Sequence, residues 1–228
     1  MQHNSIIRES DLHIIEPKQS PLGSVIWLHG LGADNRNFDP LVPALTQHGQ
    51  LPLRFIFPNA PIRPVSINNQ YPMRAWYDVY SLTHLDREDE MGIAESQRYL
   101  EKLIDTEVAR GIPTHQIILA GFSQGGAMVL HTGLRYPKPL AGILALSCYL
   151  PLFHQLTDHA SDANQNTPIF IAHGTDDDIL SASDAKITHS ILDHTHRNVL
   201  WREYPMAHEI TVEEVNDITR WLAEIFCS

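Results

Sequence analysis

The stretch that decides the fold is Gly121-Phe122-Ser123-Gln124-Gly125-Gly126. It follows an apolar run at residues 116–120 and precedes residues 127–134, whose pattern is typical of a helix. A G-x-S-x-G sequence between a strand and a helix predicts a nucleophile elbow, a sharp turn that exposes a serine hydroxyl. The N-terminus of the following helix favours negative charge at the same point. We therefore expect Ser123 to be a nucleophile.

Strand-like apolar runs alternate with helical patterns along the rest of the chain. This alternation predicts the α/β class, with a mostly parallel twisted sheet and helices on both faces. No repeat or linker divides the chain, so we expect one domain over residues 1–228. The segment 59–83 has no clear period, and a loop of that length is expected to be functional. The expected strands are 24–29, 53–57, 117–120, 141–147, 168–174 and 199–204, and the expected helices are 37–47, 86–110, 127–134, 183–194 and 211–226.

The composition excludes some classes of protein. With 27 acidic against 16 basic residues the net charge is −11, which argues against a nucleic-acid partner. An apolar loop could still touch a membrane surface transiently. The two cysteines, Cys148 and Cys227, indicate no disulfide framework. We find neither a signal-peptide pattern nor an apolar run near the ~18 residues of a membrane span, so we expect a cytoplasmic protein.

A serine nucleophile needs an imidazole base and a carboxylate that orients it, and in this architecture their chain order is serine, carboxylate, histidine. The loop after strand 168–172 carries three aspartates, and His208 follows strand 199–204. His173 precedes the aspartates and is therefore in the wrong order, while His29 precedes the serine. His208 is the expected base. The residues alone leave the aspartates open, and the candidates are Asp176, Asp177 and Asp178.

Two backbone N–H groups should form an oxyanion hole for the tetrahedral intermediate. One belongs to the residue after the nucleophile, Gln124, and the other comes from the loop after an early strand. His29 and Gly30 follow the first buried strand, so the next residue, Leu31, is the expected second donor. Acyl transfer on such a site requires no metal and no cofactor, and we expect none.

These residues lie in sequence blocks that carry a resemblance to a known family. The chain resembles the acyl-protein thioesterase and small carboxylesterase family of α/β-hydrolases, also called the phospholipase–carboxylesterase family. The resemblance extends from about residue 14 to the C-terminus. Arg74 and Ala75 depart from it, because proline and serine are more usual there. The blocks that carry the resemblance are residues 29–34 (HGLGAD), 73–78 (MRAWYD), 121–128 (GFSQGGAM), 173–178 (HGTDDD) and 204–208 (YPMAH).

The resemblance implies further properties. It selects Asp177 as the catalytic carboxylate, because the family has its aspartate at the third position after His-Gly. It implies that part of segment 59–83 covers an apolar groove near Trp76, and it makes a homodimer an expectation. Trp76, Phe122 and Leu31 are the expected substrate-binding residues, although Trp76 and its neighbour Tyr77 are equally well explained as core aromatics.

The expected function is that of a serine carboxylesterase. It would hydrolyse esters or thioesters of short- to medium-chain acyl groups through an acyl-enzyme, using Ser123, His208 and Asp177. The alternative is a lysophospholipase or acyl-protein thioesterase that acts on long-chain lipidated substrates. A third hypothesis, from another class, is a non-catalytic acyl-binding protein on the same scaffold. The sequence does not decide the acyl chain, the leaving group or the physiological substrate.

Overall fold

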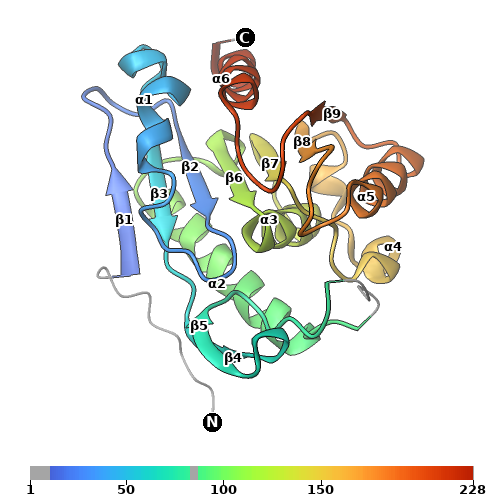
Figure 1. Cartoon of the computed structure of the whole chain (residues 1–228). Coiled ribbons are helices and arrows are strands. Elements are labelled where there is room, and N and C mark those ends of the chain that lie inside the picture. Colours follow the sequence, from blue (N-terminus) through green and yellow to red (C-terminus); the bar gives the residue numbers. More distant parts are fainter. Residues whose placement is uncertain (1–10, 83–86, 228) are drawn as a thin grey trace.

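A seven-stranded sheet forms the centre of the computed structural model, which describes residues 11–82 and 87–227 (Figure 1). Its strand order is β1-β3-β2-β6-β7-β8-β9. All neighbouring pairs are parallel except β1 with β3, so the expected mostly parallel sheet is confirmed. The strands are β1 (Leu12–Ile15), β2 (Gly23–Leu28), β3 (Leu53–Pro58), β6 (Ile117–Phe122), β7 (Gly142–Leu146), β8 (Ile169–Gly174) and β9 (Val199–Tyr204).

Helices cover both faces of the sheet because successive strand side chains point to opposite faces. Alternate residues of β2 illustrate this: Ile26 packs with the cluster that contains α2 and α3, and Trp27 packs with the cluster that contains α1 and α6. Figure 1 shows this layered arrangement. The α-helices are α1 (Val42–Leu45), α2 (Glu90–Ala109), α3 (Gln124–Arg135), α4 (Leu156–His159), α5 (Ala182–His194) and α6 (Val212–Cys227).

The central strands are buried on both faces. Every residue of β2, β3, β7 and β8 is buried, which explains why these strands are continuous apolar runs in the sequence rather than alternating patterns. The carboxyl ends of parallel strands lie at one edge of the sheet, and loops at that edge carry ligand sites in such folds. The loops after β2, β6, β8 and β9 therefore converge on one region.

Three expectations from the sequence differ from the structure. The helix expected over 37–47 is a 3₁₀ turn at Asp39–Leu41 followed by the short α1, because Pro40 and Pro43 interrupt the backbone hydrogen bonding. The helix expected from residue 86 begins at Glu90, where the Asp89 side chain caps it by accepting from the Gly92 N–H. Segment 59–83, expected to be a loop without regular structure, contains a hairpin.

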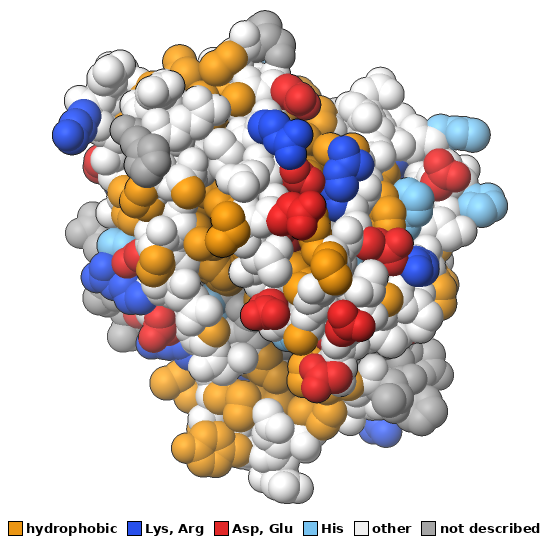
Figure 2. Space-filling view, turned by 45° about the horizontal axis from the view of Figure 1, so that its top comes forward, with side chains coloured by type: hydrophobic (Ala, Val, Ile, Leu, Met, Phe, Trp, Pro, Cys, Tyr) orange, Lys and Arg blue, Asp and Glu red, His pale blue; other side chains and the backbone are white. Residues whose placement is uncertain are grey.

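That hairpin joins β4 (Ile62–Val65) and β5 (Tyr71–Arg74) and lies apart from the main sheet (Figure 1). Its strands are too short and too proline-rich to give an alternating pattern. The hydrophobic side chains of Ile62 and Tyr71 are 67% and 66% exposed. Figure 2 shows orange hydrophobic side chains gathered along the lower edge of the face drawn, while basic and acidic side chains lie among one another above them.

Candidate active site

The turn between β6 and α3 has the backbone of a nucleophile elbow. Ser123 has φ 55° and ψ −122°, a conformation that costs a residue with a Cβ about 1–3 kcal/mol. The fold maintains it because the Ser123 N–H donates to the Leu146 carbonyl at 2.9 Å and the glycines permit a close approach. A Cβ on Gly121 would lie 2.4 Å from the Gly125 backbone, and a Cβ on Gly125 would lie 2.4 Å from the Leu28 oxygen.

His208 and Asp177 are brought together by the loops after β9 and β8. His208 Nδ1 lies 2.7 Å from Asp177 Oδ2. The loops that carry them are joined because the Thr175 N–H donates to the Tyr204 carbonyl at 2.8 Å. Among the three adjacent aspartates, Asp176 and Asp178 are exposed, whereas the Asp177 side chain is fully buried. Asp177 is therefore the aspartate that contacts the histidine expected to act as a base.

The Asp177 carboxylate is held by its own turn as well as by His208. Its Oδ1 accepts the N–H groups of Ile179 and Leu180, each at 2.9 Å. Hydrogen bonds from backbone N–H groups stabilise a buried carboxylate and fix its orientation. On the other side of the site, the rings of Phe122 and His208 have their centroids 4.8 Å apart. His208 is thus confined between a carboxylate and an aromatic ring.

The early glycine loop is oriented by His29. His29 Nε2 accepts the Ala60 N–H at 3.0 Å, so its Nδ1 carries the proton and donates to the Gly30 carbonyl at 2.7 Å. Burial lowers the pKa of His29, in accord with a neutral ring. The C=O and N–H of a trans peptide point in opposite directions. Holding the Gly30 carbonyl therefore directs the Leu31 N–H away from His29.

The other expected oxyanion donor is the Gln124 N–H. Gln124 is the first residue of α3, so its N–H has no acceptor within the helix. Both Leu31 and Gln124 line a cavity of about 320 Å³ that also contains Ser123 and His208. The lining residues are Gly30, Leu31, Ala33, Asn37, Tyr77, Val79, Ser81, Leu82, Phe122, Ser123, Gln124, Tyr149, Ile179, Leu180 and His208.

Trp76, expected as a substrate-binding residue or a core aromatic, lies behind the cavity wall rather than in it. Its side chain is completely buried, and its indole N–H donates to the His29 carbonyl at 2.8 Å. The next residue, Tyr77, lines the cavity instead. A buried tryptophan with its N–H bonded is the usual arrangement of a core aromatic.

Tyr77 and Tyr149 both line the cavity. Their hydroxyl oxygens are 3.1 Å apart, and burial raises the pKa of both phenols. The sequence left Tyr77, like Trp76, open between an acyl-site residue and a core aromatic. Tyr149 follows β7 without a motif, so no signal pointed to it. Nearby, burial raises the pKa of Glu88 to about 7, although Glu88 accepts the Leu152 N–H at 2.7 Å.

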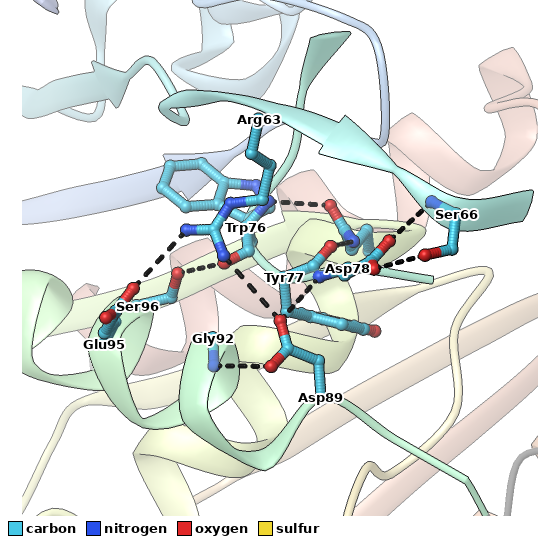
Figure 3. Close-up of polar contacts among 10 residues, drawn as sticks. Arg63, Ser66, Trp76, Tyr77, Asp78, Asp89, Gly92, Glu95 and Ser96 are labelled. Carbon is cyan, nitrogen blue, oxygen red and sulfur yellow. Dashed lines mark hydrogen bonds and ion pairs between the residues drawn. The ribbon is translucent and has the colours of Figure 1, made fainter. Parts of the chain in front are cut away.

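The Gln124 side chain connects the elbow to the cavity wall. Its Oε1 accepts the Trp76 N–H at 2.9 Å, and its Nε2 donates to the Tyr77 carbonyl at 2.8 Å. Figure 3 shows how the segment 76–78 is bonded on its other side. The Ser96 hydroxyl donates to the Trp76 carbonyl, and Asp89 accepts the Asp78 N–H at 2.9 Å. Side chains thus supply the bonds that a neighbouring strand would supply in a sheet.

The hairpin is fastened to the same segment. The Asp78 carboxylate accepts both the N–H and the hydroxyl of Ser66, at 2.7 and 2.6 Å (Figure 3). Arg63 of β4 lies 3.8 Å from Asp89 and 3.9 Å from Glu95. These contacts join β4 to the N-terminal turns of α2. The hairpin therefore determines where the wall at Tyr77 stands relative to Ser123.

The arrangement suits acyl transfer. A strained serine, a histidine bonded to a buried carboxylate and the two residues expected to donate N–H groups line one apolar cavity. Among the described residues, no cluster of three or more His, Cys, Asp or Glu side chains could hold a metal ion. The helices of the described part of the chain include none that is long and apolar enough to cross a membrane.

Residues 9–226 match the model of the phospholipase/carboxylesterase family. The chain belongs to this family. It is a serine hydrolase of the family, an enzyme that acts on carboxylic esters. An acyl-protein thioesterase 1 from Yarrowia lipolytica is 36% identical over 92% of this chain and 95% of its own length. The acyl-protein thioesterase 1 of Schizosaccharomyces pombe is 42% identical over 76% of this chain and 78% of its own.

Two solved structures that are similar to this chain have the same fold. The crystal structure of Zea mays acyl-protein thioesterase 2 superposes with a TM-score of 0.83 at 27% identity, covering 94% of this chain and 98% of that one. Arabidopsis thaliana SOBER1 superposes with a TM-score of 0.84 at 29% identity, covering 89% and 98%. The α/β-hydrolase fold expected from the elbow is thus confirmed.

Proposed function

We propose that this family member hydrolyses carboxylic esters and thioesters of short- to medium-chain acyl groups through an acyl-enzyme on Ser123. The observation that carries the proposal is the 2.7 Å hydrogen bond between His208 and Asp177 beside a cavity that contains the strained Ser123. A serine hydroxyl attacks a carbonyl only when a base accepts its proton, and that base needs a carboxylate to fix its tautomer.

In this mechanism His208 Nε2 takes the proton of Ser123 as the hydroxyl attacks the acyl carbonyl carbon. Asp177 keeps the proton of the imidazole on Nδ1 and stabilises the imidazolium. This step requires a hydrogen bond between Ser123 Oγ and His208 Nε2, and we expect it to form when substrate binds, because catalytic hydrogen bonds are often long in the free enzyme. The same proton then leaves with the alkoxide, and His208 activates the water that releases the acid.

The oxyanion that develops on the acyl carbonyl would be bound by the N–H groups of Leu31 and Gln124. Each such preorganised donor contributes about 3 kcal/mol to transition-state stabilisation. His29 supports this assignment for Leu31, because it fixes the peptide plane between Gly30 and Leu31. Leu31 and Phe122 would contact the acyl group in the cavity, whereas Trp76 would support the wall from behind.

A second candidate is an acyl-protein thioesterase that removes long acyl chains from lipidated proteins. The relatives named acyl-protein thioesterase 1, at 36% and 42% identity, favour it. A third candidate function is that of a lysophospholipase. We also propose that the protein contacts membrane surfaces transiently, which vesicle co-sedimentation would test. We further propose that it forms a homodimer, which light scattering would test.

A substrate panel tests the two candidates. The kcat/KM of the enzyme would be measured with p-nitrophenyl esters of increasing acyl length and with the matching thioesters. Each additional CH₂ that the cavity buries should contribute about 0.8 kcal/mol, or roughly fourfold in kcat/KM. A sharp fall beyond about eight carbons supports the first candidate, whereas a continued rise supports the long-chain thioesterase.

Ser123→Ala is the control for both candidates. It should abolish ester turnover and labelling by a fluorophosphonate, because no other hydroxyl stands at the elbow, and it should leave the thermal unfolding midpoint nearly unchanged. Turnover that survives in Ser123→Ala would reject Ser123 as the nucleophile. A wild-type protein that hydrolyses none of these substrates would reject the proposed function.

We also propose a reducing compartment, the cytoplasm, as the place of action. Cys148 is buried, Cys227 is exposed, and both are free. Burial raises the pKa of the Cys148 thiol, so the thiol stays protonated and unreactive. Fractionation of cells that express the tagged protein would test the location.

A further inference from the structure

His173 contacts the same carboxylate oxygen as His208. It is a residue of β8, it is only 1% exposed, and its Nε2 lies 3.3 Å from Asp177 Oδ2. The same Nε2 lies 2.8 Å from the Leu180 carbonyl. Its chain order excludes His173 as the base of the mechanism, so this second imidazole on Asp177 has a different role.

The contacts identify the tautomer of His173. Both groups that face Nε2, a carboxylate and a carbonyl, are acceptors, so Nε2 must carry a proton. The buried Nδ1 has no hydrogen-bond partner among the described residues, and a proton there would lack an acceptor. His173 is therefore a donor whose Nε2–H bonds the Leu180 carbonyl and lies close to Asp177 Oδ2.

The His173 N–H lies beside a carboxylate that three other donors bond. Oδ1 accepts two backbone N–H groups, and Oδ2 accepts from His208 Nδ1 at 2.7 Å and faces His173 Nε2 at 3.3 Å. Without His173, one side of Oδ2 would face a buried space with no donor. The Asp177 carboxylate could then rotate about its Cβ–Cγ bond. The orientation in which its Oδ2 accepts from His208 would be less well fixed.

His173 also holds the turn that carries Asp177. Leu180 donates its N–H to Asp177 Oδ1 and accepts the His173 N–H through its carbonyl, so both of its backbone groups are bonded within this turn. Leu180 lines the cavity. The position of His173 is itself fixed, because a Cβ on the next residue, Gly174, would lie 2.2 Å from the Met206 carbonyl.

We propose that His173 is a positioning residue of the active site: its Nε2–H bonds the Leu180 carbonyl and so fixes the turn that holds the Asp177 carboxylate in the orientation that bonds His208 and brings Leu180 to the cavity. The proposal goes beyond the proposed function by adding a fourth side chain to the site, and only its kinetic consequence rests on that function. The alternative is that His173 merely fills space at the end of β8.

Three substitutions separate these roles. His173→Phe keeps a ring of similar size but removes the donor. His173→Gln keeps a donor, because the glutamine amide nitrogen is the same number of bonds from Cβ as histidine Nε2. His173→Asn places its donor one bond closer to the backbone, where Nδ1 was, and cannot reach Asp177. The matched control is His131→Phe, which alters another buried histidine whose Nε2 bonds the Gln97 side chain instead.

Two measurements are made on each folded variant, after thermal unfolding has shown that it is folded. The first is kcat and KM for p-nitrophenyl butyrate. The second is the downfield proton NMR resonance of His208 Nδ1–H in its bond to Asp177, assigned by its loss in His208→Ala. The NMR measurement needs no substrate, so it decides on positioning even if the protein proves not to hydrolyse the ester.

We expect His173→Phe to lower kcat by up to about a hundredfold, the loss that misplacing a reacting group by about an ångström can cause, with little change in KM. The downfield resonance should shift or broaden. His173→Gln should restore both, and His173→Asn should not, while His131→Phe should resemble the wild type. An unchanged resonance in His173→Phe, or a His173→Gln variant as impaired as His173→Phe, would overturn the proposal.

Discussion

Ser123 has a backbone conformation that residues other than glycine seldom adopt. The neighbouring glycines permit it because they have no Cβ atoms that would clash with the nearby backbone. The α3 helix must begin immediately after the serine, and its first turn passes close to the end of β2. A Cβ on Gly125 would meet a backbone oxygen of Leu28, which cannot move aside as a side chain can. The strain at Ser123 is thus maintained by backbone contacts between β2, β6 and α3.

Gly125→Ala should disrupt this arrangement. We expect the free energy of unfolding to fall by roughly 1–3 kcal/mol through overpacking, and ester turnover to fall at least about tenfold because the elbow shifts. Urea denaturation and initial rates would measure the two effects. The control is Gly133→Ala in the same helix, where the new Cβ would meet side-chain atoms of Ile143 and Leu140 rather than backbone. Wild-type turnover in Gly125→Ala would contradict this explanation.

At the scale of elements, the wall of the cavity is an irregular segment that belongs to no sheet. Residues 76–78 are held by side chains from α3 and α2, among which Gln124 makes two bonds to the backbone. The residue whose N–H is the proposed oxyanion donor thus also fixes Tyr77. In the proposed mechanism, oxyanion binding and acyl selectivity would therefore be coupled through one residue.

Gln124→Met should weaken that coupling. Methionine has a similar length but leaves the buried Trp76 N–H without an acceptor, which costs about 1–3 kcal/mol of stability. We expect kcat/KM to fall for all esters, and the ratio of p-nitrophenyl octanoate to acetate to fall about tenfold, as a wall that no longer fits loses roughly 1.4 kcal/mol of acyl-chain contact.

The control for that experiment is Gln165→Met. Gln165 also donates to a backbone carbonyl, that of Thr195 at 2.7 Å, but it does not line the cavity. Gln165→Met should leave the ratio of kcat/KM for p-nitrophenyl octanoate to that for the acetate at the wild-type value. If the ratio also stays constant in Gln124→Met, the Gln124 side chain has no part in acyl selectivity.

At the scale of the whole molecule, one buried carboxyl group makes global stability depend on pH. Glu214 of α6 is completely buried, and neither of its oxygens has a partner among the described residues. Burial raises its pKa to about 8. In the unfolded chain the same group titrates near 4.3. Between these values the folded protein binds one proton more than the unfolded chain, so the free energy of unfolding falls as pH rises.

Glu214→Gln removes this dependence because a neutral amide has no proton to lose. The difference in free energy of unfolding between Glu214→Gln and the wild type should therefore shift in favour of the variant by at least about 1 kcal/mol from pH 5 to pH 8.5. Urea denaturation at the two pH values measures the difference. The control is Glu213→Gln, at an exposed neighbouring position. Its free energy of unfolding should differ from that of the wild type by the same amount at both pH values. A constant difference for Glu214→Gln would show that Glu214 is already ionised in the folded protein.

The sequence predicted most of the sheet but not the segment between β3 and α2. Strands such as β2 and β8 are buried on both faces, so their apolar runs report the fold directly. The hairpin β4–β5 gave no such signal, because its strands are short, contain prolines and have exposed residues that follow no period. Chain order predicted that His208 would face one of three aspartates, and it could not distinguish among them.

What the sequence by itself determined was the α/β fold, the elbow at Ser123 and the edge of the sheet to which His208 and the aspartates belong. These features follow from local patterns, in which apolar runs, glycines and strand ends have a fixed spatial meaning. Tertiary structure alone decided which way the loop side chains point. It buried Asp177 between His208 and His173, and it placed Trp76 behind Tyr77, because side-chain direction in a loop depends on contacts with residues far away in the chain.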